Sequence, residues 1–206
     1  MALTTYSELQ ASIADFLNRS DLTNEIPDFI RLAEVGMERE IRHWRMEKRS
    51  TATLDTQYSS LPDDFREPVR FIITASEVHT LEQAGPFEIS QRRANASDTT
   101  GRPEIYALLD GSIEVFPTPD TNYTLELLYY TNIDNLSSTV STNWLLTNYP
   151  DAYLYGSLMH SAPFLAEDQR IQTWSALYQR SIDAINAESE RGKTSGSGRR
   201  IKIRSY

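Results

Sequence analysis

Near both ends of the chain, apolar residues recur at steps of three and four, the spacing that places them on one face of a helix. The first such stripe follows a capping box formed by Thr5 and Glu8, which satisfies two amides at the start of a helix. Pro27 and Pro150 suit the first turns of two further helices, because the N–H that proline lacks has no helical partner there. The pattern predicts four main helices, near residues 5–18, 27–44, 150–161 and 166–190.

The middle of the chain changes to a period of two, which is typical of half-buried strands. Residues 51–55 and 123–130 alternate in this way, and residues 105–109 and 113–116 read as two further strands in the clearest β segment of the chain. Asp110-Gly111, between the latter two, is a preferred type I′ hairpin turn. We expect the strands at 105–109, 113–116 and 123–130 to form an antiparallel meander, and we expect a short helix over residues 87–94.

Helices at both ends and strands between them predict an α+β fold that is mainly helical. We expect an antiparallel helical bundle built from both ends of the sequence, with a small antiparallel β domain inserted and an extended C-terminal arm. The expected segments are 1–48 and 141–193 for the two parts of the bundle, 49–140 for the β domain and 194–206 for the arm. Four residues should be buried in the core that the helices share: Trp44, Leu158, Trp174 and Ile185.

Composition excludes several classes of protein. The chain has 206 residues and no cysteine, so it can form no disulfide, thiolate zinc site or cysteine nucleophile. No stretch approaches the roughly 20 apolar residues of a membrane span, and the first residues do not have the pattern of a secretory signal. We therefore expect no membrane partner.

Charge is distributed unevenly along the chain. Residues 191–206 hold six basic and no acidic side chains, which leaves 14 basic and 29 acidic side chains in residues 1–190. The body therefore carries a formal charge of −15 and the C-terminal segment +6. An acidic body repels phosphate backbones, whereas a small basic segment favours an acidic partner. A dedicated DNA-binding domain would have the opposite distribution.

Residues able to carry catalysis do not form a familiar motif. His43, His79 and His160 lack metal-ligand spacing, and the chain has no serine elbow or glycine-rich phosphate loop. We interpret His43 and His160 as helix-terminus or packing residues. Asp63 and Asp64 could act as an acid–base or metal-binding pair, but adjacent acids after Leu-Pro more simply form a turn or cap a helix. We expect no catalytic, metal or cofactor site.

Two other pairs have a structural interpretation. Gly36 and Gly156 fall inside predicted helices, where glycine commonly marks close packing of a neighbouring element. Arg92 and Arg93 could contact phosphate or an acidic partner, but a solvated surface pair is the simpler interpretation. The tyrosines gathered in residues 123–155 indicate core or interface rather than a platform for bases, because no arginine is interleaved with them.

The last eight residues alternate basic and apolar side chains after a Gly/Ser-rich linker. This alternation is typical of an extended strand that adds to another surface, and the alternative is a frayed basic terminus. We take seven residues as the candidate partner-binding site: Arg199, Arg200, Ile201, Lys202, Ile203, Arg204 and Tyr206.

An ordered set of motifs covers residues 4–190. It comprises Tyr6-Ser7-Glu8-Leu9, Ile26-Pro27-Asp28-Phe29-Ile30, Leu61-Pro62-Asp63-Asp64-Phe65, Gly101-Arg102-Pro103 with Tyr106, Pro117-Thr118-Pro119-Asp120, Thr142-Asn143-Trp144-Leu145-Leu146 and Tyr149-Pro150-Asp151 with Tyr153 and Tyr155-Gly156. No single motif is diagnostic, but in this order the set resembles the head-to-tail adaptor proteins of tailed bacteriophages. The podovirus members of that group are called tail tubular protein A or gatekeeper.

The resemblance implies a structural virion protein that is not an enzyme. Such adaptors form a ring, usually of twelve copies, under the portal, where they join the capsid to the tail and continue the DNA channel. The implied partners are the portal protein, a tail nozzle or tail-tube protein and further copies of the chain, with double-stranded DNA passing without specific binding. The implied location is the head–tail connector of the virion, and the host cytoplasm during assembly. In related adaptors the C-terminal arm commonly reaches the portal.

Two other functions compete with this reading. The first is a virion-associated nucleic-acid-binding protein that uses the basic C-terminal segment, and the acidic body argues against it. The second is a virion enzyme such as a nuclease or hydrolase, and the missing catalytic motif argues against it.

Overall fold

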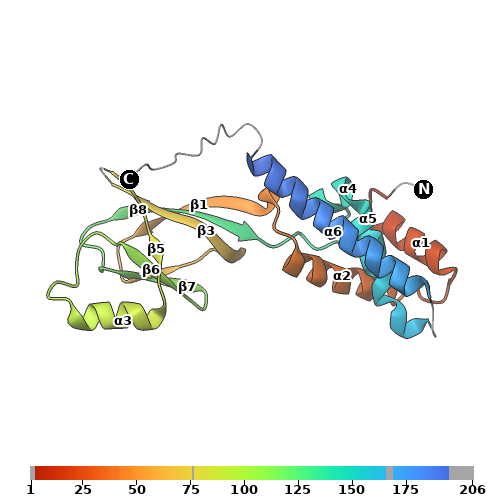
Figure 1. Ribbon diagram of the computed structural model, residues 1–206, viewed down its shortest axis with the longest axis horizontal. Helices are drawn as coiled ribbons and strands as arrows, with labels where there is room; N and C mark the ends of the chain where they lie inside the picture. Colours follow the sequence, from red (N-terminus) through yellow and green to blue (C-terminus); the bar gives the residue numbers. More distant parts are fainter. Residues whose placement is uncertain (1–2, 76, 166–168, 195–206) are drawn as a thin grey trace, which may run out of the picture. The chain divides into compact units, whose positions relative to one another are not determined.

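The chain divides into two compact units in the computed structural model, which describes residues 3–75, 77–165 and 169–194. One unit takes the chain up to Trp44 and from Ile133 onward, and the other is Arg45–Asn132. The first is helical and the second is mainly β (Figure 1). The predicted α+β fold class, with a β domain inserted into a helical one, is confirmed. None of the described helices is long and apolar enough to cross a bilayer.

The helical unit is organised around one helix. Its elements are α1 (Tyr6–Leu17), α2 (Ile26–Glu40), α4 (Trp144–Asn148), α5 (Pro150–His160) and α6 (Arg170–Thr194), with 3-10 turns at Trp44–Met46, shared with the other unit, and Ala162–Phe164. In Figure 1, α5 lies among α1, α2 and α6, and it packs against all three. Helices from the two ends of the sequence therefore share one core, as predicted.

The helix termini follow the sequence signals. The Thr5 hydroxyl accepts a hydrogen bond from the Glu8 amide at 3.3 Å, and the Glu8 carboxylate accepts one from the Thr5 amide at 3.1 Å, so the predicted capping box is confirmed. At the other end of α1, Asn18 adopts the left-handed conformation with φ 53° and closes the helix.

Glycine allows α5 to approach its neighbours closely. A Cβ on Gly156 would lie 3.1 Å from the Tyr178 ring of α6 and 3.2 Å from the Ala33 Cβ of α2. On α2, a Cβ on Gly36 would lie 3.4 Å from the Tyr178 hydroxyl oxygen. The predicted close-packing role is confirmed for Gly156, where a Cβ would crowd the Tyr178 ring, whereas a Cβ on Gly36 would make ordinary contact with the Tyr178 hydroxyl.

The β unit has three layers. Its first sheet has the order β1-β8-β3-β4, with β1 (Glu47–Leu54), β8 (Tyr123–Thr131), β3 (Phe65–Thr74) and β4 (Val78–Thr80). Its second sheet has the order β2-β7-β6-β5, with β2 (Tyr58–Ser60), β7 (Ser112–Phe116), β6 (Ile105–Leu109) and β5 (Glu82–Gln83). The sheets share one core, in which the Phe71 and Tyr106 rings lie 4.6 Å apart. Helix α3 (Pro86–Asn95), predicted over 87–94, covers the outer face of the second sheet through Ile89 (Figure 1).

The predicted three-stranded meander is wrong. β6 and β7 form the expected hairpin, with Gly111 at φ 65° in its turn, but β8 does not pair with β7. Instead β8 crosses to the other sheet and pairs antiparallel with β1 and β3. The local sequence pattern locates each strand along the chain but carries no information about which strand lies beside it.

Trp44 is the one incorrect core prediction. Leu158, Trp174 and Ile185 are buried, whereas Trp44 is 45% exposed. The reason is that α2 ends at Glu40 and the next residue is extended, which takes Trp44 off the apolar stripe of the helix. Helix α6 begins at Arg170 and continues to Thr194; part of its predicted start, residues 166–168, lies outside the described residues.

The core predicts that replacing each of two tryptophans by alanine lowers the stability by very different amounts. Trp174→Ala should lower the free energy of unfolding by about 3–5 kcal/mol, because the indole is 5% exposed and its removal leaves a cavity between helices. Trp44→Ala, the same substitution at a half-exposed site, should cost less than half as much. Urea unfolding followed by circular dichroism measures both, and equal losses would contradict the shared core.

Candidate functional site

Most residues that could carry chemistry are used to hold the fold together. His43 is buried and its ring stacks on Trp144, with centroids 5.1 Å apart, so its predicted packing role is confirmed. His160 is half-buried, and burial lowers the pKa of its imidazole. Across residues 3–75, 77–165 and 169–194, no three His, Asp or Glu side chains come together as metal ligands.

Asp64 is a structural anchor of the first sheet. Its carboxylate lies 2.6 Å from the Lys48 ammonium of β1 and accepts a hydrogen bond at 2.8 Å from the Tyr129 hydroxyl of β8. The Lys48 hydrogen bond lowers the pKa of Asp64, while burial, followed by Asp64 itself, raises the pKa of Tyr129 to about 12. Asp63 is exposed. Asp64 is therefore engaged in holding the turn to the sheet, and Asp63 takes no part in these two contacts.

Glu34 is the centre of a buried polar network in the helical unit. Its side chain is 2% exposed and accepts a hydrogen bond from the Leu136 amide at 2.7 Å and from the Tyr153 hydroxyl at 3.3 Å. Asn143 donates to the Tyr153 oxygen at 2.6 Å and caps α4 by accepting from the Leu146 amide at 2.8 Å. Burial raises the pKa values of Glu34 and Tyr153. The network joins α2, α4, α5 and the segment before α4.

The predicted surface pair Arg92-Arg93 is wrong for Arg93. Its guanidinium lies 3.3 Å from the Glu114 carboxylate, donates to the Thr118 hydroxyl at 2.9 Å and lies over the Phe116 ring. Arg93 thereby fastens α3 to β7, and the sequence offers no signal for this role. Arg92 remains exposed and pairs with Glu88, one turn earlier, at 2.7 Å.

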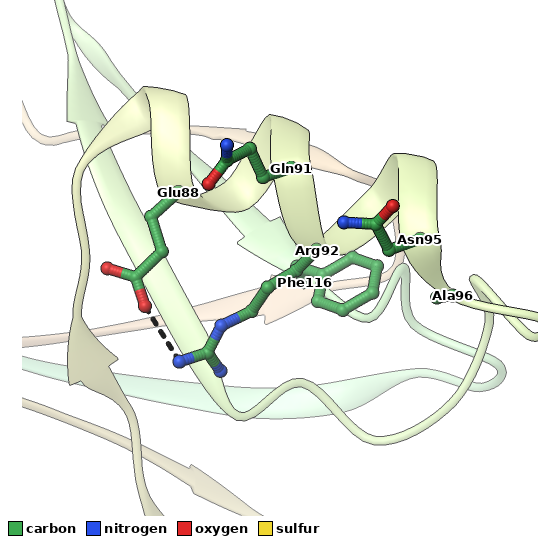
Figure 2. A pocket seen from close by; sticks show the side chains of 6 residues that line it. All are labelled: Glu88, Gln91, Arg92, Asn95, Ala96 and Phe116. Atoms are coloured by element: carbon green, nitrogen blue, oxygen red, sulfur yellow. Dashed lines mark hydrogen bonds and ion pairs between the residues drawn. The ribbon is translucent and has the colours of Figure 1, made fainter.

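A shallow polar groove lies where α3 meets β7. Figure 2 shows the Glu88–Arg92 pair and the Phe116 ring at this groove, whose volume is about 490 Å³. Most of its lining consists of polar side chains on α3. The groove offers hydrogen bonds to a visiting surface but no enclosed space for a substrate.

Large exposed apolar side chains form the remaining candidates for interaction. Both units carry them: Phe16, Leu32, Trp44 and Phe164 in the helical unit, and Tyr58, Val69, Val78 and Phe87 in the β unit. Phe87, at the start of α3, is 75% exposed. The predicted partner-binding residues 199–206 lie outside the described residues.

Comparison with known proteins identifies one family. A family model described as SU10 adaptor protein matches residues 4–201, which is nearly the whole chain and includes both compact units. No curated protein sequence gives a significant match.

Burial of Glu34 predicts how stability depends on pH. The pKa of Glu34 is higher in the folded state than in the unfolded state. The stability that this gives the fold is therefore fully present at pH values below the unfolded-state pKa, and it is lost as the pH rises through the folded-state pKa. Glu34→Gln cannot ionise, so its stability relative to wild type should rise as the pH increases through the raised folded-state pKa of Glu34. Glu34→Ala should cost about 1–3 kcal/mol because the Leu136 amide loses its acceptor.

Urea unfolding at several pH values measures both effects. The matched control is Glu188→Gln, which removes an exposed carboxylate from α6 and should leave the pH dependence unchanged. A Glu34→Gln curve parallel to wild type would show that ionisation of Glu34 does not affect stability.

Proposed function

The chain belongs to the SU10 adaptor protein family, and from this premise we propose that it forms a ring between the portal and the tail of a phage virion. The observation that carries the proposal is the family match over residues 4–201. A phage adaptor is a structural component of the virion. In more detail, we propose a ring of about twelve chains that continues the DNA channel and is assembled in the host cytoplasm. Its proposed role is structural, like that of tail tubular protein A or gatekeeper, and not enzymatic.

The acidic body supports the proposed DNA channel. Residues 1–190 carry 29 acidic and 14 basic side chains. Each basic group that neutralises a phosphate adds affinity for DNA, so a wall poor in basic groups lets the duplex slide without specific binding. The engagement of His43, Asp64 and Glu34 in the fold supports a structural rather than a catalytic role.

Exposed apolar side chains support packing between copies and against partners. Leu32 on α2 and Phe87 on α3 are 51% and 75% exposed. Burying side chains of this size contributes about 1.5–3 kcal/mol each, enough to matter in an interface between subunits. We propose that such residues meet neighbouring copies, the portal protein and a tail nozzle or tail-tube protein.

The proposed assembly has a defined order. The isolated 23.5 kDa chain should be a monomer or loose oligomer and should close into a ring only on the portal, because a free ring would compete with the portal for subunits. Native mass spectrometry with and without portal protein measures this directly. A stable ring of about twelve chains without portal would contradict the proposed order.

The C-terminal arm is the proposed binding segment for the portal or a neighbouring subunit. Deleting residues 199–206 should leave the body folded and abolish assembly on the portal. Replacing Arg200, Lys202 and Arg204 by Gln should weaken assembly in a salt-dependent way, since exposed ion pairs contribute only about 0–1 kcal/mol each. Replacing Ile201 and Ile203 by Ser should weaken it at least as much, independently of salt.

Sedimentation of the portal complex measures all three variants. Circular dichroism provides the control, because each variant must retain the spectrum of the folded body. A truncated chain that assembles with normal affinity would rule out this role of the arm.

A further inference from the structure

A second pocket lies in the β unit, between the turn before β3 and the β6–β7 hairpin. Its volume is about 540 Å³. Leu61, Phe65 and Leu108 supply apolar lining, while Asp63, Asp110 and Arg66 supply charges of both signs. We call it the hairpin pocket. One of its walls comes from the Leu61-Pro62-Asp63-Asp64-Phe65 motif, to which none of the proposed functions assigns a role.

The walls of the hairpin pocket are held in place by the fold. The Leu61 amide donates a hydrogen bond to the Gly111 carbonyl at 3.0 Å, which joins the turn to the hairpin. The Phe65 amide donates to the Pro62 carbonyl at 2.9 Å, and the Phe65 ring packs against Tyr129 with centroids 5.5 Å apart. The pocket is therefore formed before any ligand arrives, which lowers the entropic cost of binding.

Arg66 gives the pocket an unused donor. Its Nη1 atom is buried and has no hydrogen-bond acceptor among the described residues. A buried donor without an acceptor is costly, and a small turn of the Arg66 side chain toward a ligand oxygen in the pocket relieves that cost. Asp63 and Asp110 make a carboxylate a poor choice of ligand, because two like charges would face it. A backbone carbonyl is the acceptor that fits.

We propose that the hairpin pocket binds residues 199–206 of this chain. An extended segment places Ile201 and Ile203 on one face and Arg200, Lys202 and Arg204 on the other. Isoleucines match the apolar lining, basic side chains match Asp63 and Asp110, and a backbone carbonyl matches Arg66. An acidic or purely apolar peptide matches only part of this lining. The inference rests on the proposed role of the arm as a binding segment, for which it names a receptor.

The absence of cysteine from the chain allows a direct test in the full-length protein. Leu109→Cys places a thiol in the lining of the pocket, and Ile203→Cys places one in the arm. Under mild oxidation without portal, this double variant should form a disulfide about tenfold faster than the control pair Asp55→Cys and Ile203→Cys. Asp55 is exposed in the same unit but outside the pocket. A bond within one chain or between two chains supports the proposal equally.

Charge variants test the recognition itself. Asp63→Asn with Asp110→Asn should slow cross-linking about three- to tenfold at low salt and much less at high salt. Asn-Gly forms the same type of hairpin turn as Asp-Gly, so the pocket should persist. Arg66→Met should slow cross-linking about tenfold at any salt concentration, because it removes a charge-assisted hydrogen bond. Unfolding midpoints near that of the Leu109→Cys Ile203→Cys parent verify that the variants fold.

Two results would overturn the proposal: equal cross-linking rates for the Leu109 and Asp55 pairs, or rates unaffected by the Asp63, Asp110 and Arg66 substitutions. Portal protein is absent from these reactions. If the cross-linking experiment contradicts binding in the hairpin pocket, assembly on the portal is still tested by sedimentation. If assembly on the portal fails, the cross-linking result still decides whether the arm binds the hairpin pocket.

Discussion

The antiparallel pairing of β1 with β8 is the constraint on which the architecture depends. It sets Glu47 opposite Tyr130, so the chain passes into the β unit and leaves it at neighbouring points. Side chains reinforce the pairing, because Tyr130 donates a hydrogen bond to the Glu47 carboxylate at 3.2 Å and Arg49 pairs with Glu126. With these points held together, a segment of almost ninety residues interrupts the bundle without separating its two parts.

The helical unit solves the complementary problem of joining segments distant in sequence. Glu34 lies before the inserted unit and the amide of Leu136 after it, yet the two are hydrogen-bonded. Tyr178 makes a second connection, since its ring fits against Gly156 and its hydroxyl against Gly36. The Glu34 connection is a hydrogen bond, whereas the Tyr178 connection depends on glycine having no side chain. Together they determine which helices pack against each other and where along their length they meet.

Local signals in the sequence were sufficient for most elements but not for their partners. The capping box, the proline at the start of α5 and the hairpin at Asp110-Gly111 depend on residues close together in the chain, and all three are observed. The pairing of β8 and the attachment of Arg93 depend on residues far away, which periodicity does not encode. The motif set indicated the adaptor family, whereas the unused donor of Arg66 emerges only once the turn and hairpin are brought together. The predicted arm site remains a prediction.

The short outer strands of both sheets have a consequence for copies that are waiting to assemble. β2 and β4 span three residues each and β5 spans two, while the longer outer strand β1 carries the charged side chains of Lys48 and Arg49. Unpaired backbone groups along a long, flat edge would template sheet growth from one molecule to the next. In this protein the short or charged outer strands offer few backbone groups for pairing between molecules. Subunits at high concentration should therefore remain dispersed and able to associate in an ordered way instead of precipitating as fibrils.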